Sequence, residues 1–137
     1  MTNKINAFFA SWQEDEPGLK KAALACWELL ASLPDTSVEF KARPGVSYSL
    51  RACHKKQASR PLFALVDIID DDEEQRWLSV CFYDDLVTDP RKLGDQVPGG
   101  LMGEDARCFD LDDPKAPASA LNYVLTRLKE AHAAAAK

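Results

Sequence analysis

Apolar residues recur along this chain with two different periods, and each period predicts one kind of element. From Leu19 to Leu33 the apolar positions are three or four residues apart, which predicts an amphipathic helix. We expect the acidic residues and proline at 14–17 to form its first turn. Residues 118–132 have the same helical spacing, whereas Val46 to Ala52 alternates apolar and polar residues. Such alternation predicts a strand with one buried face and one polar face.

Further strand-like runs complete the predicted fold, at 38–41, 62–69, 77–83 and 106–111. Together the elements predict an α+β fold. Its sheet would be a mostly antiparallel meander of four to five strands, with an N-terminal and a C-terminal helix packed on one face. We expect residues 1–137 to form a single domain. Within it, residues 1–14 would be an arm or a short helix, and residues 133–137 a frayed tail.

The segment 84–105 lacks a sustained period and holds several glycines and prolines, so we expect a long irregular loop. It contains Gly99, Gly100, Leu101 and Met102. One interpretation is a tight loop in which glycines supply positive φ angles. The alternative is that an exposed Leu101 and Met102 contact a ligand or a partner. The segment lacks the lysine and hydroxyl of a phosphate-binding loop and is flanked by acidic residues.

The apolar fraction of 46% and the charged fraction of 28% are ordinary for a globular chain. The net charge of −5 is unevenly distributed, because residues 41–60 hold basic side chains and no acidic ones, while residues 61–113 are strongly acidic. The two segments could neutralise each other across a sheet, or the basic one could attract an anion or an acidic partner. The neighbouring acidic segment argues against a nucleic-acid binder.

No apolar run is long enough to cross a membrane, and the first residues lack the apolar stretch of a secretory signal. We therefore expect a cytoplasmic protein whose cysteines are reduced core residues. Cysteines 26, 53, 81 and 108 lack the close pairing of zinc ligands, so we expect no metal site and no cofactor. Cys53, which precedes His54 and Lys55, is the candidate for a reactive thiol.

The polar face of the strand at 46–52 is the best candidate for a binding surface. Ser47, Ser49 and Arg51 lie on that face, and Arg43 comes just before it. Two guanidinium groups on an open sheet face could hold a carboxylate or a phosphate. The alternative is that Arg51 pairs with Asp67 or with another acid of the next strand.

Several segments together resemble a group of small uncharacterised bacterial proteins, and they span roughly residues 38 to 132. They are 40–51, 76–83, 97–105 and 109–112. The order of helix, meander and helix is also similar to small YdhG-like domains of unknown function. Both resemblances imply an α+β sheet, and neither implies an activity or a site residue.

Three functions stay open at this point. The first is a binding or interaction domain that recognises an anionic small molecule or a protein partner at the polar sheet face. The second is a small enzyme that uses carboxylates of the 84–105 segment, with a deep pocket that holds Asp84 or Asp85 within hydrogen-bond reach of Arg43 or Arg51. The third is a structural homodimer or larger homo-oligomer joined by an apolar patch of Phe8, Phe9 and Trp12.

Overall fold

The computed structural model describes residues 2–13 and 19–137. Its helices and strands lie in the order α1 (Thr2–Ser11), α2 (Leu19–Ser32), β1 (Thr36–Arg43), β2 (Ser47–His54), β3 (Ala64–Ile69), β4 (Trp77–Tyr83), the 3₁₀ turn η1 (Asp84–Leu86), β5 (Asp95–Leu101), β6 (Glu104–Leu111) and α3 (Ala118–Ala135). The helical turn predicted at 14–17 lies outside the described residues.

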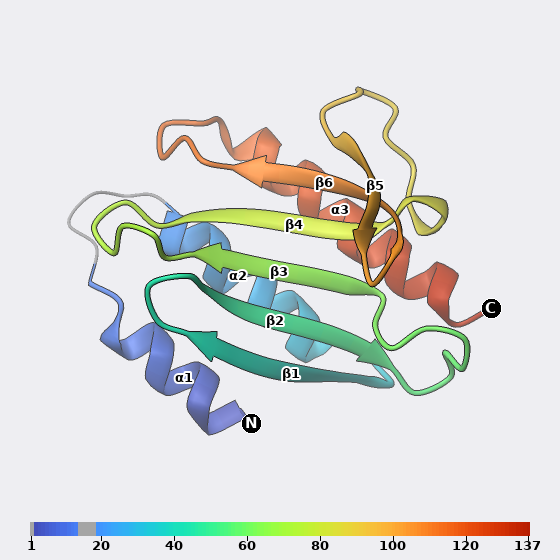
Figure 1. Ribbon diagram of the computed structural model, residues 1–137, viewed down its shortest axis with the longest axis horizontal. Coiled ribbons are helices and arrows are strands. Elements are labelled where there is room, and N and C mark those ends of the chain that lie inside the picture. Colours follow the sequence, from blue (N-terminus) through green and yellow to red (C-terminus); the bar gives the residue numbers. More distant parts are fainter. Residues whose placement is uncertain (1, 14–18) are drawn as a thin grey trace.

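The described strands form one sheet in the order β1-β2-β3-β4-β6-β5, and every neighbouring pair is antiparallel (Figure 1). The predicted α+β class with an antiparallel sheet is therefore confirmed. The predicted strand number is too low, since the sheet has six strands. The additional strand is β5, which the sequence analysis assigned to a loop.

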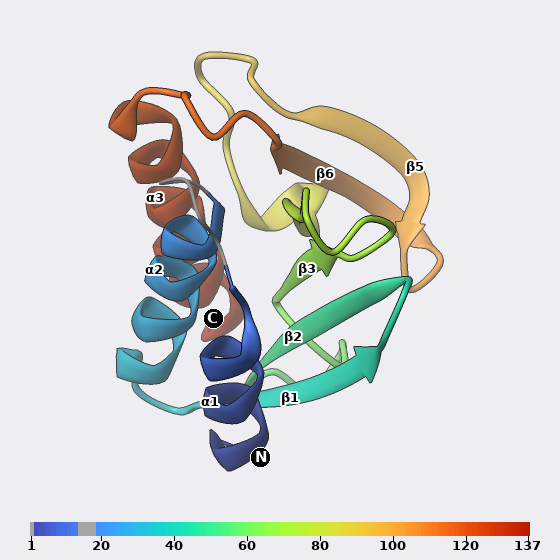
Figure 2. The same ribbon diagram turned by 90° about the vertical axis from the view of Figure 1, so that its left-hand side faces the viewer.

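Helices α1, α2 and α3 all lie on one side of the sheet (Figure 2). Their apolar stripes pack against the strand residues that point to that side, such as Leu50, Val66 and Val80, which are 0% exposed. Burial of these side chains is the main driving force for the fold. The opposite side of the sheet carries no helix, and we call it the open face.

Phe8, Phe9 and Trp12 belong to this core and do not form a surface patch. Their side chains are 7%, 5% and 3% exposed. Phe8 stacks on Tyr48 of β2 with ring centroids 4.2 Å apart. The prediction of an apolar patch that joins two copies is therefore wrong, because these side chains pack against the sheet of their own chain.

The chain after β4 is more ordered than predicted. β5 and β6 form a hairpin, and β5 passes in front of the open face at one end (Figure 1). The hairpin closes a second small cluster of apolar residues on that face, composed of Leu62, Tyr83, Leu101 and Ala106. We call this end of the sheet the covered end.

Glycines permit this hairpin to form despite its irregular register. Gly99 has a φ of 65°, and a Cβ at Gly100 would lie 2.5 Å from Cγ1 of Val97. Gly99 therefore supplies a positive φ, and Gly100 leaves the space that a Cβ would take from Val97. The expected irregular loop over 84–105 is wrong for 95–101, although η1 and residues 87–94 do form a connection.

The C-terminal helix is longer than predicted. Ala133 to Ala135 continue α3, and Ala135 is 6% exposed, so this part of the expected frayed tail packs on the protein. Within the described part of the chain, none of the helices combines the length and apolar character needed to span a membrane.

Candidate functional site

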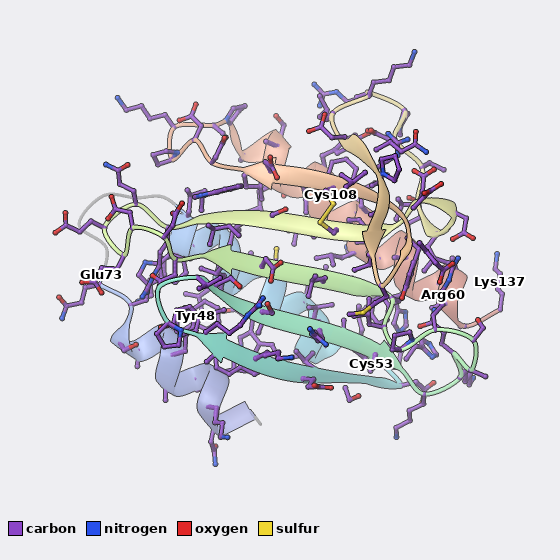
Figure 3. All side chains as sticks on the ribbon, viewed as in Figure 1. Tyr48, Cys53, Arg60, Glu73, Cys108 and Lys137 are labelled. Carbon is purple, nitrogen blue, oxygen red and sulfur yellow. A yellow bond between two sulfur atoms is a disulfide. The ribbon has the colours of Figure 1, made fainter. Side chains whose placement is uncertain are left out.

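The strand register places Arg43 and Arg51 on the open face, around a central carboxylate. Arg43 lies opposite Ser47 across the β1–β2 pair, and Ser49 lies opposite Asp67 across the β2–β3 pair. Directly opposed residues point to the same side of a sheet. We call Arg43, Arg51 and Asp67 the arginine site; Cys53, which is labelled in Figure 3, follows Arg51 by two residues on the same face of β2.

The two serines of the predicted site are buried, so their hydroxyl groups are not offered to a ligand. Ser47 is 4% and Ser49 2% exposed. The Ser49 hydroxyl donates to Asp67 Oδ1, and the Ser47 hydroxyl accepts from Arg43 Nη2 at 3.3 Å. The alternation predicted their face correctly. Their exposure was predicted wrongly, because longer neighbouring side chains lie over them.

Asp67 is a half-buried carboxylate with an altered acidity. Burial raises its pKa, and this effect exceeds the lowering by the Ser49 hydrogen bond and by the charges of Arg43 and Arg51. The carboxylate is therefore imperfectly compensated by its surroundings. The charge of Arg51 lowers the pKa of Asp67, but the alternative in which Arg51 pairs with Asp67 is not seen as an ion pair. Among the described residues no carboxylate comes within ion-pair distance of Arg43 or Arg51.

Arg51 has an unused hydrogen-bond donor. Its Nε is shielded from solvent and has no partner within the described residues. Arg43 is exposed, and its contact to Ser47 is long for a hydrogen bond. A buried donor without a partner costs about 1–3 kcal/mol, so an arriving acceptor would be stabilising.

The glycine-rich half of the predicted site lies in β5 and in the turn that follows it. Gly99, Gly100 and Leu101 belong to β5, which forms the sheet edge opposite β1. Leu101 is 1% exposed in the second cluster, so its predicted exposure is wrong, while Met102 is 47% exposed at the hairpin turn. Cys53 and Leu65 pack against the second cluster, and Leu65 is the direct partner of Arg51 across β2 and β3, so the cluster that contains Leu101 lies beside Arg51.

The carboxylates of the enzyme hypothesis have other partners. Asp84 accepts from Arg107 Nε at 2.7 Å, and Asp85 accepts from Arg60 Nη1 at 2.7 Å and Nη2 at 2.9 Å. Neither aspartate pairs with Arg43 or Arg51, so the required catalytic pairing is absent from the described contacts. These ion pairs hold the β4–β5 connection on the sheet.

Two of the cysteines are bonded to each other, which corrects the expectation that all four are reduced. Cys81 and Cys108 are directly opposed across β4 and β6 and form a disulfide with a Cα–Cα distance of 4.1 Å. Their sequence separation is 27 residues. Closing a loop of this length stabilises the fold by roughly 3 kcal/mol in the chain-entropy model. The register of two strands distant in sequence creates this pair, and spacing alone does not reveal it.

Cys53 does not have the environment of a reactive thiol. Burial raises its pKa, with a further rise from Glu39 and an opposing effect of Arg51. Its neighbour His54 is 6% exposed, and its Nδ1 accepts from the backbone N–H of Lys56. Burial also raises the pKa of Cys26, to about 12. The predicted candidate thiol is thus protonated at neutral pH and a weak nucleophile.

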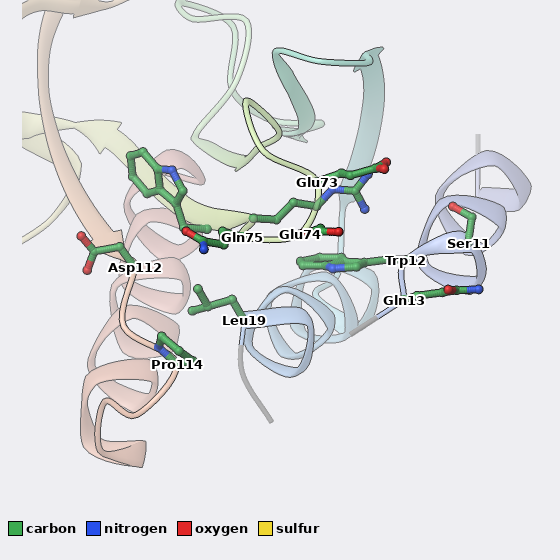
Figure 4. A pocket seen from close by; sticks show the side chains of 11 residues that line it. Ser11, Trp12, Gln13, Leu19, Glu73, Glu74, Gln75, Asp112 and Pro114 are labelled. Carbon is green, nitrogen blue, oxygen red and sulfur yellow. The ribbon is translucent and has the colours of Figure 1, made fainter. Parts of the chain in front are cut away.

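A groove with a volume of about 900 Å³ lies between α1, α2, the β3–β4 connection and the segment after β6 (Figure 4). Trp12, Glu73, Arg76 and Asp112 are among its lining residues. Arg76 already donates to Asp70 at 2.6 Å and lies 5.4 Å from the Trp12 ring centroid, so its charge is used within the fold.

No family model, no curated protein and no solved structure matches this chain. The resemblance to small bacterial proteins therefore stays a prediction. Within residues 2–13 and 19–137, no group of three histidine, cysteine or acidic side chains is arranged to hold a metal ion. The candidate site therefore rests on the geometry of Arg43, Arg51 and Asp67 alone.

Proposed function

We propose that the protein is a binding domain that recognises an anion, such as a carboxylate or a phosphate group, at the arginine site. The unpartnered Nε of Arg51 is the observation that carries this proposal. Arg43 supplies a second guanidinium group on the same face, and a planar guanidinium can hold two oxygens at once.

Asp67 gives the site a selective element. Its negative charge disfavours a weakly held anion, so the ligand must contact the guanidinium groups directly to bind. Protonation of Asp67 would remove this repulsion, and its raised pKa brings protonation closer to neutral pH. We therefore expect anion affinity to increase as the pH is lowered.

Thermal unfolding with inorganic phosphate and with citrate tests the proposal. A bound anion at one hundred times its Kd stabilises a protein by about 2.7 kcal/mol, which raises the Tm by several degrees. We expect the Arg51→Ala and Arg43→Ala variants to lose this rise. Lys55→Ala is the matched control, because it removes an exposed cation whose side chain has no hydrogen-bond or ion-pair partner among the described residues.

The Arg51→Lys variant separates specific contact from general charge. It keeps the charge and loses the guanidinium fork, so we expect most of the anion effect to disappear. An equal rise of the Tm in the wild type and in both arginine-to-alanine variants would show that the anion binds elsewhere, and no rise in the wild type would show that it does not bind.

A further inference from the structure

The Cys81–Cys108 disulfide lies on the open face, where Figure 3 labels Cys108, and its two cysteines differ in exposure. Cys81 is 9% exposed, whereas Cys108 is half-buried. A small thiol breaks a disulfide by attack on one sulfur through a mixed disulfide, and access decides which sulfur reacts. The asymmetry therefore favours attack on Cys108.

The strand order strengthens this preference. An attacking thiolate approaches a disulfide in line, from the side opposite the leaving sulfur. The approach to Cys81 comes from β3, where its direct neighbour Leu65 packs against the second cluster. Cys108 also packs against this cluster, but the in-line approach to it comes from β5, where its direct neighbour Asp95 is exposed.

Carboxylates surround the open approach to Cys108. Asp95 lies opposite Cys108, and Asp110 follows two residues later on β6. Burial raises the pKa of Asp110, and the charges of Asp112 and Asp95 add to this rise while a Ser79 hydrogen bond opposes it. These acidic groups are near enough to act on one another, so their combined field repels an anionic thiol and attracts a cationic one.

We propose that Cys108 is a site of thiol–disulfide exchange for small thiols that carry a positive charge. The thiolate of the small thiol bonds to Cys108 Sγ, and the Cys81–Cys108 bond breaks. The electron pair stays on Cys81 Sγ, which takes a proton from water. A second small thiolate then attacks the mixed disulfide at the sulfur of the first, which yields the oxidised small disulfide and a Cys108 thiolate. The proposal does not depend on anion binding at the arginine site.

Exchange rates of the disulfide-bonded full chain test this assignment. The probes are cysteamine, 2-mercaptoethanol and 3-mercaptopropionate, which are cationic, neutral and anionic. Each rate is divided by the rate of the same thiol with a neutral small disulfide, so that intrinsic reactivity cancels. At low salt we expect the corrected cysteamine rate to exceed that of 3-mercaptopropionate about tenfold, and the difference to shrink in about 0.5 M salt.

Peptide mapping after an acid quench identifies the modified cysteine, and we expect the mixed disulfide on Cys108. The Asp95→Asn variant should reduce the tenfold difference to about threefold. Glu73→Gln is the matched control, since it removes an exposed acid on the β3–β4 connection and should leave the difference unchanged.

Three outcomes would overturn the proposal: equal corrected rates, a mixed disulfide located on Cys81, or an Asp95→Asn variant with the full tenfold difference. Failure of Cys81 and Cys108 to bond to each other in the folded chain would do the same. These measurements use the wild type and surface variants, so their outcome does not depend on whether a cysteine variant folds.

Discussion

Two arginines on the same sheet face differ in how well their guanidinium groups are paired. Arg60 lies at the covered end, and Arg51 lies in the arginine site. Arg60 donates to Asp85 and Glu104 and lies 4.2 Å from the Tyr83 ring centroid. Its pKa is raised, first by the hydrogen bonds to Asp85 and Glu104. Arg51 has no ion pair with the described residues and an Nε without a partner.

This difference separates a structural arginine from an available one. The guanidinium of Arg60 completes a charge network that holds the hairpin over the second cluster. The guanidinium of Arg51 is held in place by the sheet while part of its hydrogen-bonding capacity stays unused. A guanidinium group that lacks hydrogen-bond partners within the protein indicates a ligand site better than its positive charge does.

The largest expected effect comes from opening the covered end. Leu101→Ala removes a side chain that is 1% exposed and should lower the free energy of unfolding by about 3 kcal/mol, because it leaves a cavity beneath β5. Met102→Ala is the matched control at the next position, which is 47% exposed, and should change the value by less than about 0.5 kcal/mol. Urea unfolding measures both. Similar effects of the two substitutions would contradict the burial of Leu101.

The periodicity of the sequence predicts the elements that pack on the main core, because each has one apolar side. β2 is an example, since the alternation at 46–52 gives its two faces and most of its extent, although the strand continues to His54. β5 has no such alternation, and its residues Asp95 to Gly100 are exposed. Its place in the sheet depends on pairing with β6 and on partners of Leu101 that are distant in sequence.

The candidate site is predicted in part for the same reason. The faces of Arg43 and Arg51 follow from strand alternation. The burial of Ser49 and the closeness of Asp67 depend on the register between β2 and β3, which a single strand does not encode. The disulfide and the partners of Asp84 and Asp85 are likewise products of long-range register.

A smaller effect is expected from removal of the two arginine side chains. Arg60→Ala should lower the free energy of unfolding by about 1 kcal/mol, a modest value because Asp85 and Glu104 are 68% and 48% exposed. Arg51→Ala should be near neutral, since it also removes a buried donor without a partner. Chemical denaturation of both variants checks this. A larger loss for Arg51→Ala would show that its charge is already satisfied within the fold.

The smallest expected effect concerns the pH dependence of Asp67. Its pKa is raised in the folded protein, chiefly by burial, so the ionised form at pH 7 is less favourable in the folded chain than in the unfolded chain. As the pH falls through the raised pKa, the folded state binds the proton first and this cost disappears. Asp67→Asn should therefore be more stable than the wild type at pH 7, by less than about 1 kcal/mol, and the difference should vanish in acid.

Asp89 is the control for Asp67, because its pKa is lowered in the folded protein and not raised. Burial raises its pKa, yet hydrogen bonds from Tyr123, Gly94, Leu93 and Arg107 together lower it. Its stabilisation is complete above the ordinary pKa of aspartate and is lost as the pH falls through the lowered value. Asp89→Asn should therefore be less stable than the wild type at pH 7, with a deficit that shrinks in acid. Urea midpoints measured between pH 7 and pH 3 compare the two variants. Deficits of the same sign at pH 7 would mean that the charge of Asp67 is compensated as fully as that of Asp89, and the arginine site would then have no unsatisfied charge to offer a ligand.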